Sequence, residues 1–394
     1  MVVCLRMACF YKFVNSILSN GDEAFLKEAL LEVSLYSAET CEKMAKAASL
    51  RYVSDSVPGI SRKKNKAGFI YYYPDGRQVL EEKVLQRINA LAIPPAYHDV
   101  WICPYANGHI QATARDDRNR KQYRYHSLWQ ECRQQQKFYM MISFGKALTA
   151  IREHVNRELR KPATLSREQI ICAIIYLLDN ACLRIGNSVY ARENKSYGLT
   201  TLRKKHLSIE ENKAMFDFEG KSSKIWHIDL KDRKIVKILK KCEEIPGYEL
   251  FKYYDENGAL NVVCSQEINA YLQTLTKKPF TAKDFRTWIA CRETLCRLVE
   301  ICLSNEPPTP KNLKSTIKEV ADLLGHTTSV CQKNYIYPGM LIWWQQGRLH
   351  SWVKRNKAKI QQLDDDSLLL YWLKKACKEN EDLLLKSRKK YSSA

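Results

Sequence analysis

The feature of this sequence that most constrains its fold is a change in hydrophobic periodicity near residue 137. Between about residues 59 and 122, short runs rich in β-branched and aromatic residues alternate with turn residues, which is typical of strands. The dipeptide Asn107-Gly108 separates the runs Val100–Cys103 and His109–Thr113 and predicts a β-hairpin. Beyond residue 137 the apolar residues mostly recur at helical spacing. The sequence therefore predicts an α+β fold, with a small β-rich domain before a mainly α-helical one.

Capping signals mark the ends of several helices. Ser166 with Gln169, and Thr281 with Asp284, each form a capping box before an apolar helical pattern. A helix over about residues 313–324 is expected to end at Gly325, because glycine readily adopts the left-handed conformation that follows many helices. These signals place helix boundaries near residues 166, 281 and 325.

One β-type interlude interrupts the helical region. The runs Met215–Phe218 and Ile225–Leu230 alternate between apolar and polar residues. The short segment between them, residues 219–223, contains Gly220 and two serines, which are common turn residues. We therefore expect a β-hairpin that carries Lys221 at its tip.

The charge balance indicates the class of partner. The chain has 394 residues and a formal net charge of +21, with 27% charged and 10% aromatic residues. Such an excess of positive charge favours an extended polyanion, and nucleic acid is the commonest one. A ribosome-associated protein or a basic membrane-surface protein is the alternative interpretation of charge alone.

Cysteine usage and hydropathy exclude several other classes. The 14 cysteines are scattered without any CxxC pair, so neither a disulfide framework nor a zinc module is expected. We therefore expect an intracellular protein whose cysteines are reduced. Arg6 and Lys12 interrupt the apolar start, residues 1–18, which is too short to span a bilayer. No Walker loop and no acidic cluster suited to Mg²⁺ is visible, so we expect no cofactor and no metal.

Five polar, reactive residues occupy positions that a purely structural role explains less well. They are Arg184 after an apolar helix, Lys221 at the hairpin tip, Arg286 in the first turns of a helix, His326 after a helix-stopping glycine, and Tyr335. Each has an ordinary explanation alone, such as a salt bridge, a solvated turn, a helix cap or a core aromatic. Their order along the chain makes the combination informative.

In this order the surrounding segments resemble the type IB DNA topoisomerases. Leu183–Asn187 is similar to the family's first-arginine box, Phe216–Lys221 to its lysine hairpin, Lys283–Trp288 to its second-arginine box, and Leu324–His326 with Lys333–Tyr335 to its histidine–tyrosine segment. Upstream, Ile93–Tyr97, Val100–Cys103, Gly108–Thr113 and Arg120–Tyr123 resemble the N-terminal domain of the poxvirus and bacterial branch. The resemblance covers about residues 55–340.

The resemblance implies a role for each of the five residues. Tyr335, in preference to the nearby Tyr337, would attack a DNA phosphate and become joined to the 3′ phosphate of the cut strand. Arg184 and Arg286 would donate to the non-bridging oxygens, for which the guanidinium fork is suited. His326 would donate to a non-bridging oxygen as well. Lys221, in preference to Lys224, would protonate the leaving 5′ oxygen.

The resemblance also implies DNA contacts outside the catalytic set. Gln122, Tyr123 and Tyr125 match positions that contact DNA bases and backbone in the poxvirus branch, and Arg124 between the tyrosines is expected to contact phosphate. Tyr190 matches a tyrosine near the active site of that branch. An exposed polar strand is the ordinary alternative for residues 122–125.

Two rival functions remain at this point. A tyrosine recombinase shares the arginine–lysine–arginine–histidine–tyrosine set, but usually carries a histidine where this chain has Lys283, and a helical DNA-binding domain where this chain has strands. A nucleic-acid-binding protein without catalysis is the second rival. The presence of all five reactive residues disfavours it.

The resemblance thus implies a metal- and ATP-independent enzyme that relaxes supercoiled duplex DNA through a 3′-phosphotyrosine intermediate. We expect a helical extension over residues 1–54, a β-rich DNA-binding domain over 55–135, a catalytic domain over 136–345 and a helical basic tail over 346–394. The two DNA-binding domains are expected to form a clamp around DNA. Duplex DNA is the expected partner, and the protein is expected to be a monomer away from membranes. A bacterial cytoplasm with the nucleoid is the favoured location, and a virion or a eukaryotic organelle is the alternative.

Overall fold

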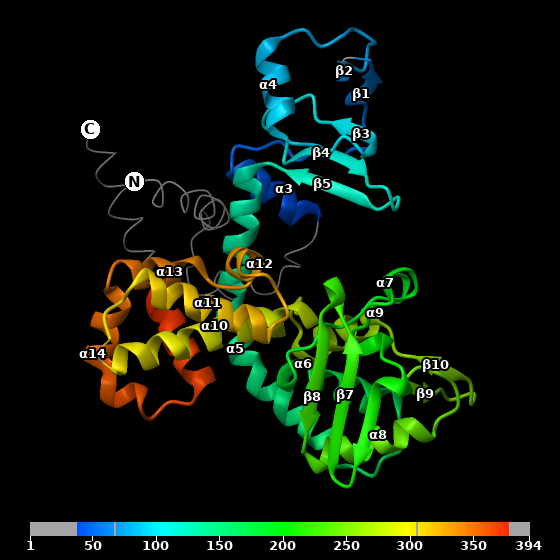
Figure 1. Ribbon diagram of the computed structural model, residues 1–394, viewed down its shortest axis with the longest axis vertical. Coiled ribbons are helices and arrows are strands. Elements are labelled where there is room, and N and C mark those ends of the chain that lie inside the picture. Colours follow the sequence, from blue (N-terminus) through cyan, green and yellow to red (C-terminus); the bar gives the residue numbers. More distant parts are fainter. Residues whose placement is uncertain (1–37, 67, 305, 378–394) are drawn as a thin grey trace. The chain divides into compact units, whose positions relative to one another are not determined.

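The computed structural model describes residues 38–66, 68–304 and 306–377 (Figure 1). The chain divides into two compact units, and the division falls between Phe138 and Tyr139. The first unit contains a five-stranded antiparallel sheet, and the second is mainly helical. This combination confirms the predicted α+β class. Among the described residues, no helix is both long and apolar enough to cross a membrane.

The first unit is built on a sheet with the strand order β2-β1-β3-β4-β5. Its elements are α3 (Ala38–Ala47), β1 (Ile60–Asn65), β2 (Gly68–Tyr72), α4 (Glu82–Ala90), β3 (His98–Ile102), β4 (Ile110–Arg115) and β5 (Lys121–Tyr125). The predicted hairpin at Asn107-Gly108 is confirmed, because β3 and β4 pair in antiparallel register around it. Strand β2 ends before the turn that contains Gly76.

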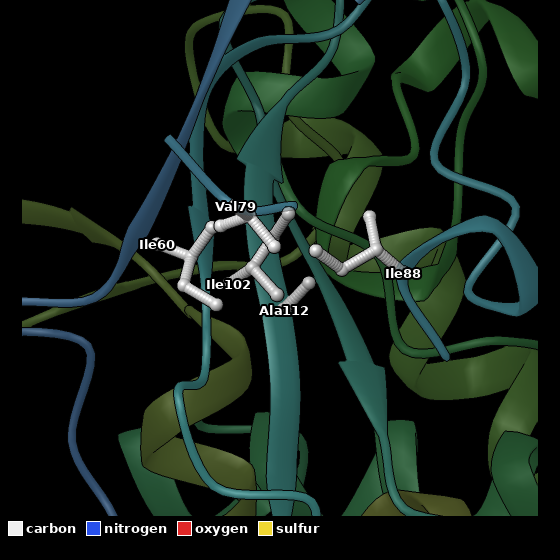
Figure 2. Close-up of a cluster of buried hydrophobic side chains, with 5 residues drawn as sticks. All are labelled: Ile60, Val79, Ile88, Ile102 and Ala112. Atoms are coloured by element: carbon white, nitrogen blue, oxygen red, sulfur yellow. The ribbon is translucent and has the colours of Figure 1, made fainter. Parts of the chain in front are cut away.

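The core of this unit lies between the sheet and α4. Figure 2 shows Ile60, Val79, Ile102 and Ala112 gathered on one side and Ile88 of α4 reaching toward them. All five side chains are almost completely buried. Burying aliphatic side chains contributes about 25 cal/mol for each Å² removed from water, so α4 is held to the sheet mainly by this contact. Strand β5, the edge strand at the other end of the sheet from β2, has exposed aromatic and basic side chains.

The second unit consists of helices around one long buried helix, with two small sheets. The helices are α6 (Arg167–Asn180), α7 (Ser188–Asn194), α8 (Arg233–Glu244), α9 (Ser265–Thr276), α10 (Ala282–Leu303), α11 (Pro310–Leu323), α12 (Thr328–Asn334), α13 (Pro338–Gln345) and α14 (Arg348–Ile360). Residues 365–377 form a further helix. Helix α5 (Ser127–Arg160) begins in the first unit and ends in the second.

Helix α10 is the centre of this packing. It lies against α6, α11 and α14 (Figure 1). Its start is fixed as predicted, because the backbone N–H and the hydroxyl of Thr281 both donate to the Asp284 carboxylate. Phe285 and Trp288 are buried against Phe144 of α5, with Phe285 edge-on to it at a ring distance of 5.1 Å. Aromatic pairs in this geometry hold the first turns of α10 firmly in place.

The predicted lysine hairpin is present as two strands of a three-stranded sheet. β7 (Lys213–Glu219) pairs with β8 (Ile225–Leu230), and β6 (Leu207–Glu210) adds a strand on the other side of β7. A short 3-10 turn, η3 (Lys221–Ser223), forms the hairpin tip. The sequence did not predict β6 or the small hairpin of β9 (Lys252–Tyr254) and β10 (Leu260–Val262). These strands are too short for alternation to be recognised.

Candidate active site

Arg184 is held by a tight turn in the irregular segment after α6. The backbone N–H of Leu199 donates to the Arg184 carbonyl at 2.9 Å, and that of Thr200 donates to the Ile185 carbonyl at 2.7 Å. Gly186 has a φ of +100°, and a Cβ on Gly198 would lie 2.6 Å from the Gly186 Cα. Both positions therefore need glycine for the two segments to approach, and this approach fixes the backbone of Arg184.

Arg286 is buried in the second turn of α10, with only 4% of its surface exposed. Its guanidinium donates to the carbonyls of Cys182 and Leu324, and one Nη lies 2.9 Å from Nε2 of His326. Burial, together with the nearby charge of Arg184, lowers the pKa of Arg286 to about 10. The guanidinium therefore stays charged at neutral pH, and two backbone carbonyls determine its orientation.

His326 lies between the two arginines. Nη2 of Arg184 is 3.1 Å from Nδ1 of the imidazole and also donates to the Gly325 carbonyl at 2.9 Å. Burial, followed by the positive charges of Arg286, Arg184, Lys221 and Lys224, lowers the pKa of His326 to about 3. The ring is therefore neutral at pH 7, so one of its nitrogens carries a hydrogen and the other a lone pair.

This protonation state has a consequence for the two arginine contacts. Guanidinium groups can only donate, and a neutral imidazole can accept at only one nitrogen. Only one of the two arginines can therefore hydrogen-bond to His326, and the remaining imidazole N–H faces a positive charge. Such an arrangement favours an anion, because an anionic oxygen can accept from the imidazole and from both arginines.

Tyr335 lies directly beside this group, at the C-terminal end of α12. Its ring centroid is 4.4 Å from that of His326, and the guanidinium carbon of Arg286 is 5.9 Å from the tyrosine ring. The thiol of Cys291 donates to the Tyr335 carbonyl at 3.1 Å, which ties this backbone to α10. Tyr337, by contrast, packs edge-on against Trp372 at a ring distance of 5.8 Å. Of the two tyrosines, Tyr335 is the one at the arginines and the histidine.

Lys221 is exposed at the tip of the β7–β8 hairpin. It lies close enough to His326 for its charge to lower the histidine pKa. Lys224, the alternative lysine, donates instead to the backbone carbonyl of Asp322 at 2.6 Å, at the end of α11. The structure thus brings Arg184, Arg286, His326 and Tyr335 together, with the Lys221 hairpin next to them.

The other residues singled out in the sequence lie mostly on β5 in the first unit. Tyr123 and Tyr125 are exposed and their rings stack at 5.8 Å, 6° from parallel. Arg124 donates to the Ala92 carbonyl at 3.2 Å, and the Gln122 amide donates to Asp116 at 3.0 Å. The backbone of Tyr190 belongs to α7, but its side chain lies outside the described part of the structure.

One group of side chains has the composition of a metal site. Within the described residues, ligand atoms of His154, Glu158 and Glu168 lie within 4.8 Å of one another. Their polar atoms have partners in the chain: Lys161 donates to both oxygens of Glu158, and the Tyr271 hydroxyl donates to Glu168 at 2.6 Å. A cation would have to displace these contacts, so this cluster is better explained as a structural network.

Asp366, for which no signal was visible in the sequence, supports α10 from the helix formed by residues 365–377. Its carboxylate accepts from Trp288 Nε1 at 2.5 Å and from Arg152 at 2.6 Å, and lies 3.4 Å from Arg292. Burial alone would raise the pKa of Asp366, but the bonds from Trp288 and Arg152 hold it below its ordinary value. Trp288 follows Arg286 on α10, so Asp366 helps to position the segment that carries this arginine.

Replacing Asp366 by asparagine is expected to lower the free energy of unfolding by about 2–3 kcal/mol, because two arginines would be left next to a neutral amide. Urea denaturation followed by tryptophan fluorescence measures this change. Glu319→Gln is the matched control: that carboxylate is 57% exposed and 3.4 Å from Arg297. Its loss is expected to cost less than about 0.5 kcal/mol. Equal effects of the two substitutions would contradict the role assigned to Asp366.

Comparison with known proteins decides the family. Residues 126–347 match the family model of the eukaryotic DNA topoisomerase I catalytic core, and residues 68–116 match the bacterial DNA topoisomerase IB N-terminal domain. The DNA topoisomerase 1B of Acanthamoeba polyphaga mimivirus is 32% identical over 289 residues, which cover 71% of this chain and 85% of the viral protein. The chain belongs to the type IB DNA topoisomerase family.

Two further members of the family match with lower identity. The DNA topoisomerase 1B of vaccinia virus (strain Copenhagen) is 26% identical over 226 residues, or 56% of this chain and 68% of the viral protein. The DNA topoisomerase 1 of Candida albicans is 30% identical over 162 residues, or 38% of this chain and 19% of the fungal protein. As a type IB DNA topoisomerase the chain is an isomerase, and the recombinase alternative is not supported. All five candidate catalytic residues fall within the region matched by the catalytic-core model.

Proposed function

We propose that this topoisomerase relaxes supercoiled duplex DNA by cutting one strand with Tyr335, forming a 3′-phosphotyrosine and resealing the strand, without ATP or a metal ion. The observation that carries the proposal is the convergence of Arg184 and Arg286 on the two ring nitrogens of His326, with Tyr335 beside them. This arrangement combines a nucleophile with several donors for one phosphate group.

The chemistry follows from the positions of these groups. The Tyr335 oxygen attacks phosphorus, its proton passes to water, and the bond from phosphorus to the 5′ oxygen breaks. Negative charge increases on the non-bridging oxygens during attack, and fixed donors stabilise that charge most. Arg286 is oriented by two carbonyls, and Arg184 by one carbonyl and the imidazole. In the complex, the phosphate would accept from both arginines and from the N–H of neutral His326.

The phosphotyrosine keeps the energy of the phosphodiester bond. Resealing is the reverse attack by the freed 5′ hydroxyl, so no ATP is required. The donors already present for the phosphate are all protein side chains, which supports a reaction without a metal. Rotation of the cut strand about the intact one between the two steps would release supercoils.

The hairpin lysine supplies the proton for the leaving oxygen in this proposal. Lys221 suits the role because it is exposed beside His326, whereas Lys224 is bonded to the carbonyl of Asp322. Tyr335 suits the role of nucleophile better than Tyr337, which packs against Trp372. A positioned general acid contributes about 10²- to 10⁴-fold to the rate of such a step.

Strand β5 is the proposed DNA contact of the first unit. The exposed, stacked rings of Tyr123 and Tyr125 offer flat surfaces to DNA, and Arg124 between them offers a charge to the phosphate backbone.

Every cysteine in the described ranges is a free thiol, which supports a reducing compartment such as the bacterial cytoplasm and its nucleoid.

Relaxation of supercoiled plasmid with EDTA present and ATP absent tests the proposal. We expect both positively and negatively supercoiled plasmid to be converted to relaxed topoisomers, because rotation about one intact strand has no preferred sign. Gel electrophoresis in the presence and absence of an intercalator distinguishes the products. Relaxation only after addition of Mg²⁺ or ATP would overturn the proposed mechanism. Unchanged topology in every condition, with DNA binding intact, would indicate a member that has lost catalysis.

A further inference from the structure

A tryptophan links the lysine hairpin to the loop that carries the active-site histidine. Trp226 lies on β8 and is only 9% exposed. A Cβ on Gly220 would lie 2.6 Å from its Nε1, and a Cβ on Gly325 would lie 2.6 Å from its Cζ2. The indole is therefore inserted between two glycines. One of them directly precedes Lys221 and the other directly precedes His326.

The hairpin side of this contact is held by further bonds. The hydroxyl of Ser196 donates to the Gly220 carbonyl at 3.0 Å, and the Gly220 N–H donates to the Lys224 carbonyl at 2.8 Å. In register with Trp226 on β7 is Phe218, and the two rings are 6.5 Å apart and nearly parallel. The base of the tip is thus fixed, although Lys221 itself remains exposed.

The loop side is equally constrained. Gly325 has a φ of +62°, and its N–H donates to the Asp322 carbonyl at 3.1 Å. The Gly325 carbonyl accepts from Arg184, and the next residue is His326. Lys224 donates to the same Asp322 carbonyl from the hairpin side. The end of α11 therefore contacts the hairpin through the Trp226 ring and the Lys224 ammonium.

The tip needs such support because its backbone is strained. Ser222 and Ser223 have φ values of +64° and +55°, which L-residues adopt sparingly and retain only when the surroundings hold them. A change at the base of the hairpin would let these two serines relax and would move the adjacent Lys221. Displacement of a catalytic group by about 1 Å is enough to slow a reaction by about 10²-fold.

We propose that Trp226 is a positioning residue for DNA cleavage: its indole holds the hairpin against Gly325, so that Lys221 stands at a fixed separation from His326 and the bound phosphate. Trp226 acts through Lys221 and touches no substrate. The inference rests on the proposed role of Lys221 as the proton donor to the 5′ oxygen. It extends that role by naming the side chain that determines where the donor stands.

The test uses a leaving group that needs no proton. Cleavage breaks the bond from phosphorus to the 5′ oxygen, which takes a proton from the Lys221 ammonium. A duplex with sulfur in place of that one oxygen releases a thiolate, which can leave without being protonated because a thiol is a far stronger acid than an alcohol. The full-length protein would be used in single-turnover cleavage of matched oxygen and sulfur duplexes, at a site mapped first with the unmodified protein on plasmid DNA.

We expect Trp226→Ala to cleave the oxygen duplex about 10- to 100-fold more slowly than the unmodified protein does. On the sulfur duplex, its cleavage rate should lie within about threefold of the rate of the unmodified protein. Trp226→Phe keeps a ring next to Phe218 but reaches less far toward Gly325, so we expect a smaller defect with the same recovery. This milder variant keeps the test valid if Trp226→Ala does not fold. Ile225→Ala, at an exposed neighbouring position on β8, is the matched control and is expected to cleave both duplexes normally.

The Lys221→Ala variant tests the proton-donor role of Lys221 separately from the positioning role of Trp226. Recovery of this variant on the sulfur duplex supports its role as proton donor, and lack of recovery overturns that role and the inference with it. If Lys221→Ala recovers but the Trp226 variants are equally slow on both duplexes, Trp226 acts on the fold alone and the inference is wrong. Normal cleavage of the oxygen duplex by both Trp226 variants would overturn it as well.

Discussion

Tyr335→Phe is expected to reduce DNA cleavage by at least about 10⁴-fold, because it removes the attacking oxygen itself. The substitution deletes one hydroxyl and leaves the ring that packs beside His326. DNA affinity is therefore expected to stay within about threefold of the original, since binding depends mainly on phosphate contacts elsewhere. Trapping of covalent protein–DNA complexes with detergent measures cleavage, and filter binding at fixed salt measures affinity.

Tyr337→Phe is the matched control for this experiment. Tyr337 lies two residues further along, and its ring packs against Trp372 and close to Gly339. We expect this variant to form the covalent complex at nearly the original rate. Covalent complex formation by Tyr335→Phe would show that Tyr335 is not the nucleophile. Loss of the complex in Tyr337→Phe with the fold intact would show the same. Joint loss of binding and cleavage in Tyr335→Phe would contradict the separation of the two functions.

Arg286→Lys is expected to slow cleavage by about 10²- to 10³-fold, although the charge is kept. The guanidinium donates to the carbonyls of Cys182 and Leu324 at the same time and lies 2.9 Å from Nε2 of His326, and an ammonium cannot reproduce this planar fork. At least one buried carbonyl would lose its partner, so we also expect the free energy of unfolding to fall by about 1–3 kcal/mol. Single-turnover cleavage and urea denaturation measure the two effects.

Arg297→Lys provides the comparison on the same helix. Arg297 forms ion pairs with Glu293 and Glu319, and its side chain is 30% exposed. We expect cleavage by this variant to be unchanged and its stability to fall by less than about 1 kcal/mol. A cleavage rate for Arg286→Lys within about threefold of the original would show that charge alone is needed at this position, contrary to the geometric argument.

The cluster of positive charges around His326 also explains why a buried histidine stays neutral in a strongly basic protein. His326 is surrounded by Arg184, Arg286 and two lysines, and protonation would add a further positive charge to them. As the pH falls below about 6.5, the unfolded chain protonates this histidine while the folded chain does not until about pH 3. The unfolded state therefore binds more protons in this interval, and His326 makes the fold less stable as the pH decreases through it.

The sequence by itself predicted most of the longer elements and proposed which residues react. Asn107-Gly108, Thr281 with Asp284, and Gly325 each act through short-range backbone chemistry, and the hairpin and the helix ends lie where these residues predict. The five reactive residues could be selected because their order and spacing match a family. Such signals are read from neighbouring residues and need no knowledge of packing.

Only the tertiary structure decided how these residues support one another. Arg286 is oriented by the carbonyls of Cys182 and Leu324, and backbone carbonyls carry no sequence signature. Asp366 reaches Trp288 from a helix far along the chain, and Trp226 fits between two glycines that are distant in sequence. Contacts of this kind depend on which surfaces meet after folding. Residue type and local spacing therefore predict the reacting groups, while the positions of those groups are determined by long-range packing.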